Sequence, residues 1–171
     1  MTAVFVHGVP ETAEVWSPLI AQLDRDDVAA LSLPGFGRDL DFEPTMHRYA
    51  ECMAGQLEGF DEVDLVTHDW GALLALAVLA AAPDNVRSWV VDVGDLGPDH
   101  RWHDLALLWQ TPGEGEAFMD GVVEASVEER AEMMVATGIP ASGAPAMAAA
   151  WDRRMSDAIL GLYRSATRIG V

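Results

Sequence analysis

The order of apolar runs in the first 93 residues limits the possible folds more than any other feature of this chain. Four short apolar runs are typical of buried strands, and they lie at residues 3–6, 28–33, 63–67 and 87–93. Helical spacing of apolar residues connects them, first after Ser17-Pro18, then over 45–60, and finally over 72–82, which is apolar on every side. Strands that alternate with helices form a parallel sheet with helices on both faces. We therefore expect an α/β fold.

The pattern changes after Gly94 to helices and loops. Ser126 to Glu129 match a capping box that opens a helix, and residues 138–145 are rich in glycine and proline, which predicts a loop. Residues 147–167 then predict one long helix. We expect residues 1–94 to form the core of the fold and residues 95–171 to form a helical cap or lid.

Charge and composition exclude several classes of partner. Ten arginines, no lysine and 28 acidic residues give a formal charge of −18, which repels nucleic acid and anionic lipid. The longest apolar run, at 72–83, is too short to cross a bilayer. We expect no nucleic-acid partner and no membrane partner. The single cysteine, Cys52, and a first segment without a basic leader favour a cytoplasmic protein.

A short motif lies where the third strand leads directly into the apolar helix. Its sequence is Thr67-His68-Asp69-Trp70-Gly71. Such a junction can form a strained turn, the nucleophile elbow, which lifts the central side chain above the sheet. A carboxylate at the start of a helix faces the positive end of the helix dipole and can stay ionised. Asp69 is therefore a candidate nucleophile, although an aspartate in this position is often a simple helix cap.

A second motif follows the first strand and supports the first one. It consists of His7-Gly8-Val9-Pro10. We expect the backbone N–H groups of Val9 and Trp70 to converge on the negative oxygen that forms when an ester intermediate is hydrolysed. The remaining motif residues are expected to hold the geometry of the two loops, namely His7, Gly8, Pro10, His68 and Gly71.

Three stretches together resemble the α/β-hydrolase superfamily, and within it the branch of epoxide hydrolases and haloalkane dehalogenases. They are FVHGVPE at 5–11, LSLPGFG at 31–37 and VTHDWGALLA at 66–75. The resemblance implies an α/β-hydrolase fold with a helical cap and a small apolar electrophilic substrate. It also implies that Asp69 attacks a carbon atom to form an alkyl ester, which a histidine-activated water then hydrolyses. Thr67 departs from the glycine that is common in this branch.

The resemblance favours an epoxide hydrolase over a haloalkane dehalogenase. Dehalogenases of this branch typically hold the halide with the tryptophan after the nucleophile and a second donor, often an asparagine after His-Gly. This chain has Val9 there, and its side chain cannot donate a hydrogen bond. Epoxide hydrolases supply a proton from cap tyrosines, because an alkoxide is too basic to leave unaided. Residues 108–113 look like their YFQEPG stretch, and residues 162–164 look like their WYRN stretch.

By this resemblance Tyr163 is the candidate catalytic acid. Leu108 stands where the first tyrosine of the usual pair is found, and Leu108 and Trp109 are expected to line the pocket. Packing alone is the alternative interpretation of Tyr163, because Ile159 and Ala166 share its helical face.

The acid and the base that complete the reaction are less clearly marked. Asp92, near the end of the fourth strand, stands where some dehalogenases place the acid that orients the histidine, and Asp95 is the neighbouring alternative. The family continues after the cap with further strands, a possible acid and the catalytic histidine. None of the five histidines here matches that base, so the C-terminal strands and the base are expected to be missing from these 171 residues. An inactive ligand-binding remnant is therefore a hypothesis of a different class.

We expect neither a metal nor a cofactor. His100 and His103 lie near Asp99 and Asp104, but no third ligand has a recognisable metal-site spacing. The fourth strand would be an open edge of the sheet in a chain without further strands, and an open edge favours a homo-oligomer.

Overall fold

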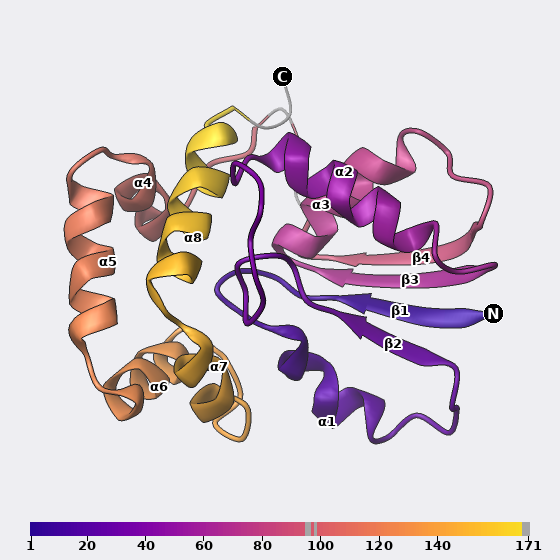
Figure 1. Cartoon of the computed structure of the whole chain (residues 1–171), viewed down its shortest axis with the longest axis horizontal. Coiled ribbons are helices and arrows are strands. Elements are labelled where there is room, and N and C mark those ends of the chain that lie inside the picture. The colour runs from indigo at the N-terminus through magenta and orange to yellow at the C-terminus, as the bar shows by residue number, and fades with distance from the viewer. Residues whose placement is uncertain (95–96, 98, 169–171) are drawn as a thin grey trace.

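Four strands form one parallel sheet in the computed structural model, which describes residues 1–94, 97 and 99–168 (Figure 1). The sheet order is β2-β1-β3-β4, and all three pairings are parallel, which confirms the expected α/β architecture. The strands are β1 (Thr2–Val6), β2 (Val28–Leu31), β3 (Val63–His68) and β4 (Val86–Asp92). Because Val6 pairs with Thr67, the loops after β1 and β3 leave the sheet side by side.

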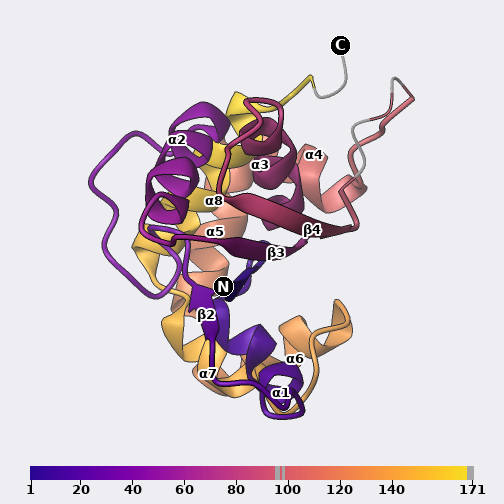
Figure 2. The same cartoon turned by 90° about the vertical axis from the view of Figure 1, so that its right-hand side faces the viewer.

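Helices cover both faces of the sheet next to its central strands (Figure 2). One face carries α2 (Met46–Leu57) and α3 (Trp70–Leu79), and the other carries η1 (Ala13–Trp16) and α1 (Ser17–Ile20). The helix expected after Ser17 is a single α-helical turn, and the 3-10 turn η1 precedes it. Alternate residues of β3 are buried, as expected for a strand with one face against α2 and α3.

Five helices follow and lie beside the carboxyl ends of the strands (Figure 1). They are α4 (Asp104–Gln110), α5 (Glu114–Glu124), α6 (Val127–Ala136), α7 (Ala144–Ala150) and α8 (Arg153–Ser165). The capping box at Ser126 is confirmed, with its hydroxyl accepting from the Glu129 N–H. None of the helices in the described part of the chain is long and apolar enough to cross a bilayer.

The single long helix expected over 147–167 is wrong. The chain is extended at Trp151 and Asp152, and this break separates α7 from α8. Asp152 starts α8, because its carboxylate accepts a hydrogen bond of 2.9 Å from the Met155 N–H. A side-chain cap of this kind stabilises a new helix start, and apolar spacing does not reveal it.

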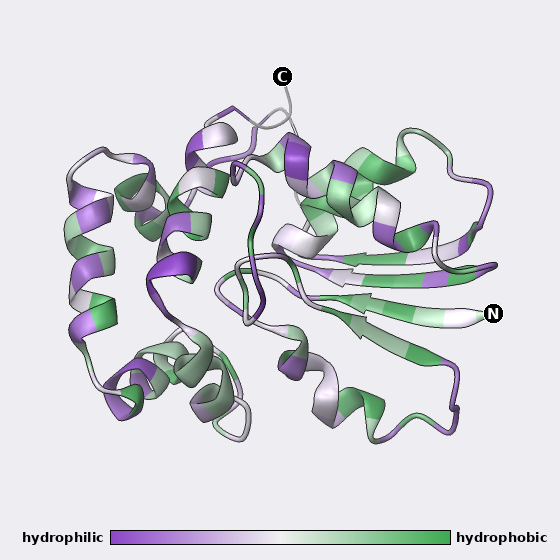
Figure 3. Cartoon of the chain, viewed as in Figure 1, coloured by the Kyte–Doolittle hydropathy of each residue, from purple (hydrophilic) through white to green (hydrophobic). Residues whose placement is uncertain are grey.

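The edge strand β4 is unusually exposed for a strand of its composition. Trp89 and Val90 are 54% and 56% exposed, and Val93, just beyond the strand, is 68% exposed. Figure 3 shows that the strands are mostly hydrophobic. The β4 edge is therefore an unpaired apolar surface in this part of the chain, and its pairing with a second copy stays a prediction.

Candidate active site

Asp69 occupies a sharp turn between β3 and α3. Its φ of 51° and ψ of −121° place it in a left-handed region that few residues other than glycine adopt. Its side chain makes no helix-capping hydrogen bond. Instead its Oδ1 accepts a hydrogen bond of 2.8 Å from the Val9 N–H. This geometry is that of a nucleophile elbow, and it argues against the interpretation of Asp69 as a simple cap.

Two glycines allow the loops to approach this closely. A Cβ atom on Gly8 would lie 2.5 Å from Asp69 Cβ and 2.6 Å from its Oδ1. A Cβ atom on Gly71 would lie 2.6 Å from the carbonyl oxygen of His7. Neither distance is possible for a real side chain, so the first turn of α3 can lie against the end of β1 only with glycine at both positions. Thr67 fits the same junction, because its hydroxyl donates to the Val90 carbonyl of β4.

His7 ties the β1 loop to the loop after β2. Its Nδ1 donates to the Gly8 carbonyl oxygen at 2.6 Å, and its Nε2 accepts from the Leu33 N–H at 3.0 Å. Complete burial lowers the pKa of His7 from 6.5 to about 4. Since both ring nitrogens are engaged and the ring is neutral, His7 positions the loop that carries Val9 and is not a catalytic base.

Three polar side chains from separate segments meet beside the elbow. His68 Nδ1 lies 2.9 Å from Asp92 Oδ2, and His68 Nε2 lies 3.8 Å from Glu11 Oε1. Asp92 is therefore bound to a motif histidine, and its side chain is 67% exposed. Glu11 was not anticipated from sequence, although it ends the first motif stretch. Its Oε2 accepts from the Gly8 N–H at 2.9 Å, and burial raises its pKa.

A cavity of about 400 Å³ opens between the elbow and the C-terminal helices. Asp69, Val9, Pro10, Glu11 and His68 line it on the sheet side. Most of the opposite wall is apolar and comes from residues that sequence reasoning did not assign, among them Leu105, Phe118, Met133, Met134 and Ile139. A chamber of this size, with its carboxyl groups on one side and a mostly apolar opposite wall, suits a small apolar ligand.

The two pocket residues expected on α4 separate in the structure. Trp109 lines the cavity and is buried, whereas Leu108 lies outside the lining and packs against the hydrophobic core. The expectation for Leu108 is thus corrected. The two side chains point in different directions because successive helical residues are about 100° apart, and α4 turns Trp109 toward α8. Asp92 also lies outside this lining and borders a neighbouring groove with Glu11 and His68.

Tyr163 of α8 reaches the same cavity as Asp69. Its ring is 2% exposed and contacts Trp70, Trp102 and Trp109 at centroid distances of 4.9 to 5.2 Å. Tyr163 therefore both packs against the aromatic core and borders the cavity, so the two interpretations of this residue do not exclude one another. Burial first, and then the charge of Asp69, raise the pKa of Tyr163 well above its usual range. The phenol consequently keeps its proton at neutral pH and can donate it.

Asp69 and His103 complete the polar lining. Burial raises the pKa of Asp69 above 3.8, while the N–H groups of Val9 and Trp70 and the charges of His68 and His103 act in the opposite direction. The two N–H groups expected to form an oxyanion site thus both act on the Asp69 carboxylate itself. His103 Nδ1 accepts from the Ala106 N–H and caps α4, so this nitrogen is not free to take a proton from water.

The chain matches the family described as "Alpha/beta hydrolase family" over residues 3–168. It is 35% identical over 96 residues to epoxide hydrolase 2 from Siraitia grosvenorii, which is 51% of this chain and 30% of that protein. It is 29% identical over 150 residues to a haloalkane dehalogenase from Mesorhizobium japonicum, which is 74% of this chain and 47% of that protein. The chain therefore spans less than half the length of these two relatives.

Solved structures show the same architecture. A loop variant of a haloalkane dehalogenase from Bradyrhizobium elkanii has a TM-score of 0.72 at 22% identity, over 99% of this chain and 62% of that one. An epoxide hydrolase from Vigna radiata has a TM-score of 0.72 at 20% identity, over 95% of this chain and 63% of that one. With its parallel sheet, its nucleophile elbow and the family match, this chain belongs to the alpha/beta hydrolase family.

Proposed function

We propose that this chain opens an epoxide, with Asp69 as the nucleophile and Tyr163 as the proton donor. One observation carries the proposal: a carboxylate on a strained turn and a protonated phenol border the same apolar cavity. In this proposal residues 1–94 hold the nucleophile, and residues 95–171 act as the cap that supplies the phenol. The relatives include an epoxide hydrolase, which is consistent with this activity.

The reaction changes two bonds at the attacked carbon and moves one proton. An Asp69 oxygen attacks a ring carbon, the carbon–oxygen bond of the epoxide breaks, and its electron pair moves to the ring oxygen. That oxygen takes the proton of Tyr163, which leaves a hydroxyalkyl ester on Asp69 and a tyrosinate. The N–H groups of Val9 and Trp70 then lie where the ester carbonyl can become negative during hydrolysis.

The experiment is alkylation of the purified chain by a panel of aliphatic and aromatic epoxides, followed by peptide mass spectrometry. We expect a mass increase equal to one epoxide on the peptide that carries Asp69. The increase should be absent from Asp69→Asn and strongly slowed in Tyr163→Phe. If no epoxide of the panel modifies Asp69 in the folded wild-type chain, the proposal is wrong. Thermal stabilisation by the same epoxides that persists in Asp69→Asn would instead support a ligand-binding remnant.

A haloalkane dehalogenase is the second candidate, and one observation favours it. The indole N–H groups of Trp70 and Trp109 are buried and have no hydrogen-bond partner among the described residues. Trp109 lines the same cavity as Asp69, and Trp70 follows Asp69 in the chain. Unpaired indole donors suit a departing halide, which needs hydrogen bonds but no proton. A relative named haloalkane dehalogenase covers more of this chain than the epoxide hydrolase does. Bromide release from 1-bromoalkanes, with no alkylation by epoxides, would select this candidate.

A further inference from the structure

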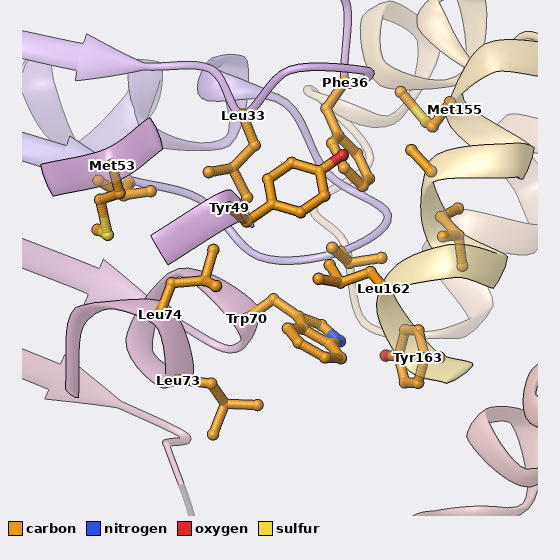
Figure 4. Packing of buried hydrophobic residues seen from close by; sticks show 14 of the residues in the cluster. Leu33, Phe36, Tyr49, Met53, Trp70, Leu73, Leu74, Met155, Leu162 and Tyr163 are labelled. Carbon is orange, nitrogen blue, oxygen red and sulfur yellow. The ribbon is translucent and has the colours of Figure 1, made fainter. Parts of the chain in front are cut away.

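The indole of Trp70 is buried next to the proposed proton donor. Trp70 has no exposed surface, and its Nε1 makes no hydrogen bond of acceptable geometry to the described residues. Its ring meets the Tyr163 ring edge to face, with 5.0 Å between centroids and 72° between planes. Figure 4 shows the Trp70 nitrogen and the Tyr163 hydroxyl pointing toward one another. A buried N–H without a hydrogen bond lowers the stability of a folded protein, so such a group is uncommon and needs an explanation. Here the explanation must account for its direction toward the Tyr163 hydroxyl.

We propose that Trp70 is a positioning residue whose indole N–H hydrogen-bonds to the oxygen of Tyr163 when that residue gives up its proton. The inference rests on the proposed epoxide opening. It gives a function to the Trp70 side chain, in addition to the hydrogen bond that the Trp70 backbone N–H donates to Asp69. Leu108 stands where the resemblance places a second tyrosine, and it lies outside the cavity lining. The Trp70 N–H would therefore be the group that stabilises the one phenol, Tyr163.

The electrostatics of the site explain why such support is needed. Burial and the charge of the Asp69 carboxylate raise the pKa of Tyr163 in the free protein, and the burial remains when the tyrosinate forms and the Asp69 charge is consumed in the ester. The indole of Trp70 acts in the opposite direction on the same pKa. Its N–H hydrogen bond would be stronger to the tyrosinate than to the neutral phenol, so it stabilises the transition state more than the ground state.

The proton balance is simple. The Tyr163 proton moves to the ring oxygen as the carbon–oxygen bond breaks and the Asp69 ester forms. The tyrosinate keeps the electron pair of its O–H bond and accepts the Trp70 N–H hydrogen bond. Water later returns a proton to Tyr163. The indole proton stays on nitrogen throughout, so Trp70 acts on the substrate only through Tyr163.

The test compares Trp70→Phe with Trp102→Phe in single-turnover alkylation. Trp102 is a matched control, because its ring stacks on Trp70 and contacts Tyr163, while its own N–H donates to the Ala166 carbonyl oxygen at 3.0 Å. Each epoxide is paired with its thiirane, whose leaving thiolate is far less basic than an alkoxide and needs little proton donation. We expect Trp70→Phe to slow epoxide alkylation about 10- to 100-fold more than thiirane alkylation, as for a hydrogen bond to a charged group.

The outcomes separate this inference from the proposed function. Equal slowing of epoxide and thiirane by Trp70→Phe, or the same epoxide-to-thiirane ratio in both variants, would overturn the role of Trp70 but leave the epoxide opening intact. A wild-type chain that no epoxide alkylates contradicts the proposed function itself.

A second measurement does not depend on the reaction or on the stability of Trp70→Phe. Tyr163→Phe keeps the ring that faces Trp70 and removes the hydroxyl. In ¹H–¹⁵N spectra of the free protein, we expect the Trp70 indole N–H signal to move more than those of Trp109 and Trp102. An unchanged Trp70 signal means that the N–H does not sense the hydroxyl, which contradicts the inference.

Discussion

The free energy of unfolding of this chain should fall in mild acid because His7 is buried in its neutral form. The His7 ring is completely buried, and its two nitrogens bind the Gly8 carbonyl oxygen and the Leu33 N–H, which only the neutral ring can do. Burial lowers its pKa from 6.5 to about 4. As the pH falls through 6.5 the unfolded chain takes up a proton that the folded chain refuses until about pH 4. His7 therefore contributes stability that is complete above this range and is lost within it.

The size of the effect follows from the width of that range. A difference between 6.5 and about 4 is worth roughly 3.4 kcal/mol in total, of which about 2 kcal/mol is lost by about pH 5. This is a large share of the 5 to 15 kcal/mol, in order of magnitude, that holds a domain folded. The loss should be visible before most carboxylates titrate, since their ordinary pKa values are about 4.

Urea unfolding followed by circular dichroism measures the effect, with His7→Gln as the reference. A glutamine can accept the Leu33 N–H through its side-chain oxygen but does not titrate. The difference in free energy of unfolding between wild type and His7→Gln should shrink by about 2 kcal/mol from about pH 7.5 to about pH 5. Parallel pH curves for the two proteins would refute the reasoning. So would an NMR titration in which the His7 ring becomes protonated near its ordinary pKa, a measurement that remains possible if His7→Gln does not fold.

Three further predictions concern the elbow, the loop before it and a helix cap. Asp69→Asn should leave the melting temperature unchanged or higher at neutral pH, because a pKa raised above 3.8 means that the ionised carboxylate lowers the stability of the fold. The gain in melting temperature should shrink toward pH 4. A lower melting temperature of Asp69→Asn at neutral pH would contradict this prediction. Gly8→Ala should slow alkylation of Asp69 by an epoxide about 100-fold, since the new methyl group displaces the carboxylate. The control is Gly55→Ala, where a methyl group meets open space, and its Asp69 should be alkylated at the wild-type rate. Ser126→Ala should lower the free energy of unfolding by about 1 kcal/mol through loss of the α6 cap, as measured by thermal denaturation.

The parts of this molecule that could be predicted from sequence are those set by local pattern. The alternation of strands and helices in the first 93 residues could be predicted because short apolar runs indicate the strands and apolar residues at helical spacing indicate the helices. The elbow at Asp69 and the loop at Val9 each lie within a few consecutive residues. Their mutual contact follows from the order of neighbouring parallel strands, which place the two loops together.

The features that could not be predicted depend on contacts between distant segments. The cluster of Glu11, His68 and Asp92 joins the loop after β1 to the last residues of β3 and β4, and no spacing within any one of these segments reveals it. Which residue of α4 faces the cavity depends on how that helix packs on α8, and a rotation by one residue exchanges Leu108 for Trp109. The break between α7 and α8 depends on one capping carboxylate at Asp152.

The cavity has two walls with separate origins in the chain. Asp69 and its hydrogen-bond donors come from turns at the ends of strands, where glycines leave no spare room. Most of the apolar wall comes from α4 to α6 and the segments that join and follow them. Mutations in the helices can therefore change the shape of the cavity without moving the Asp69 carboxylate, so ligand preference and carboxylate position can evolve separately in this fold.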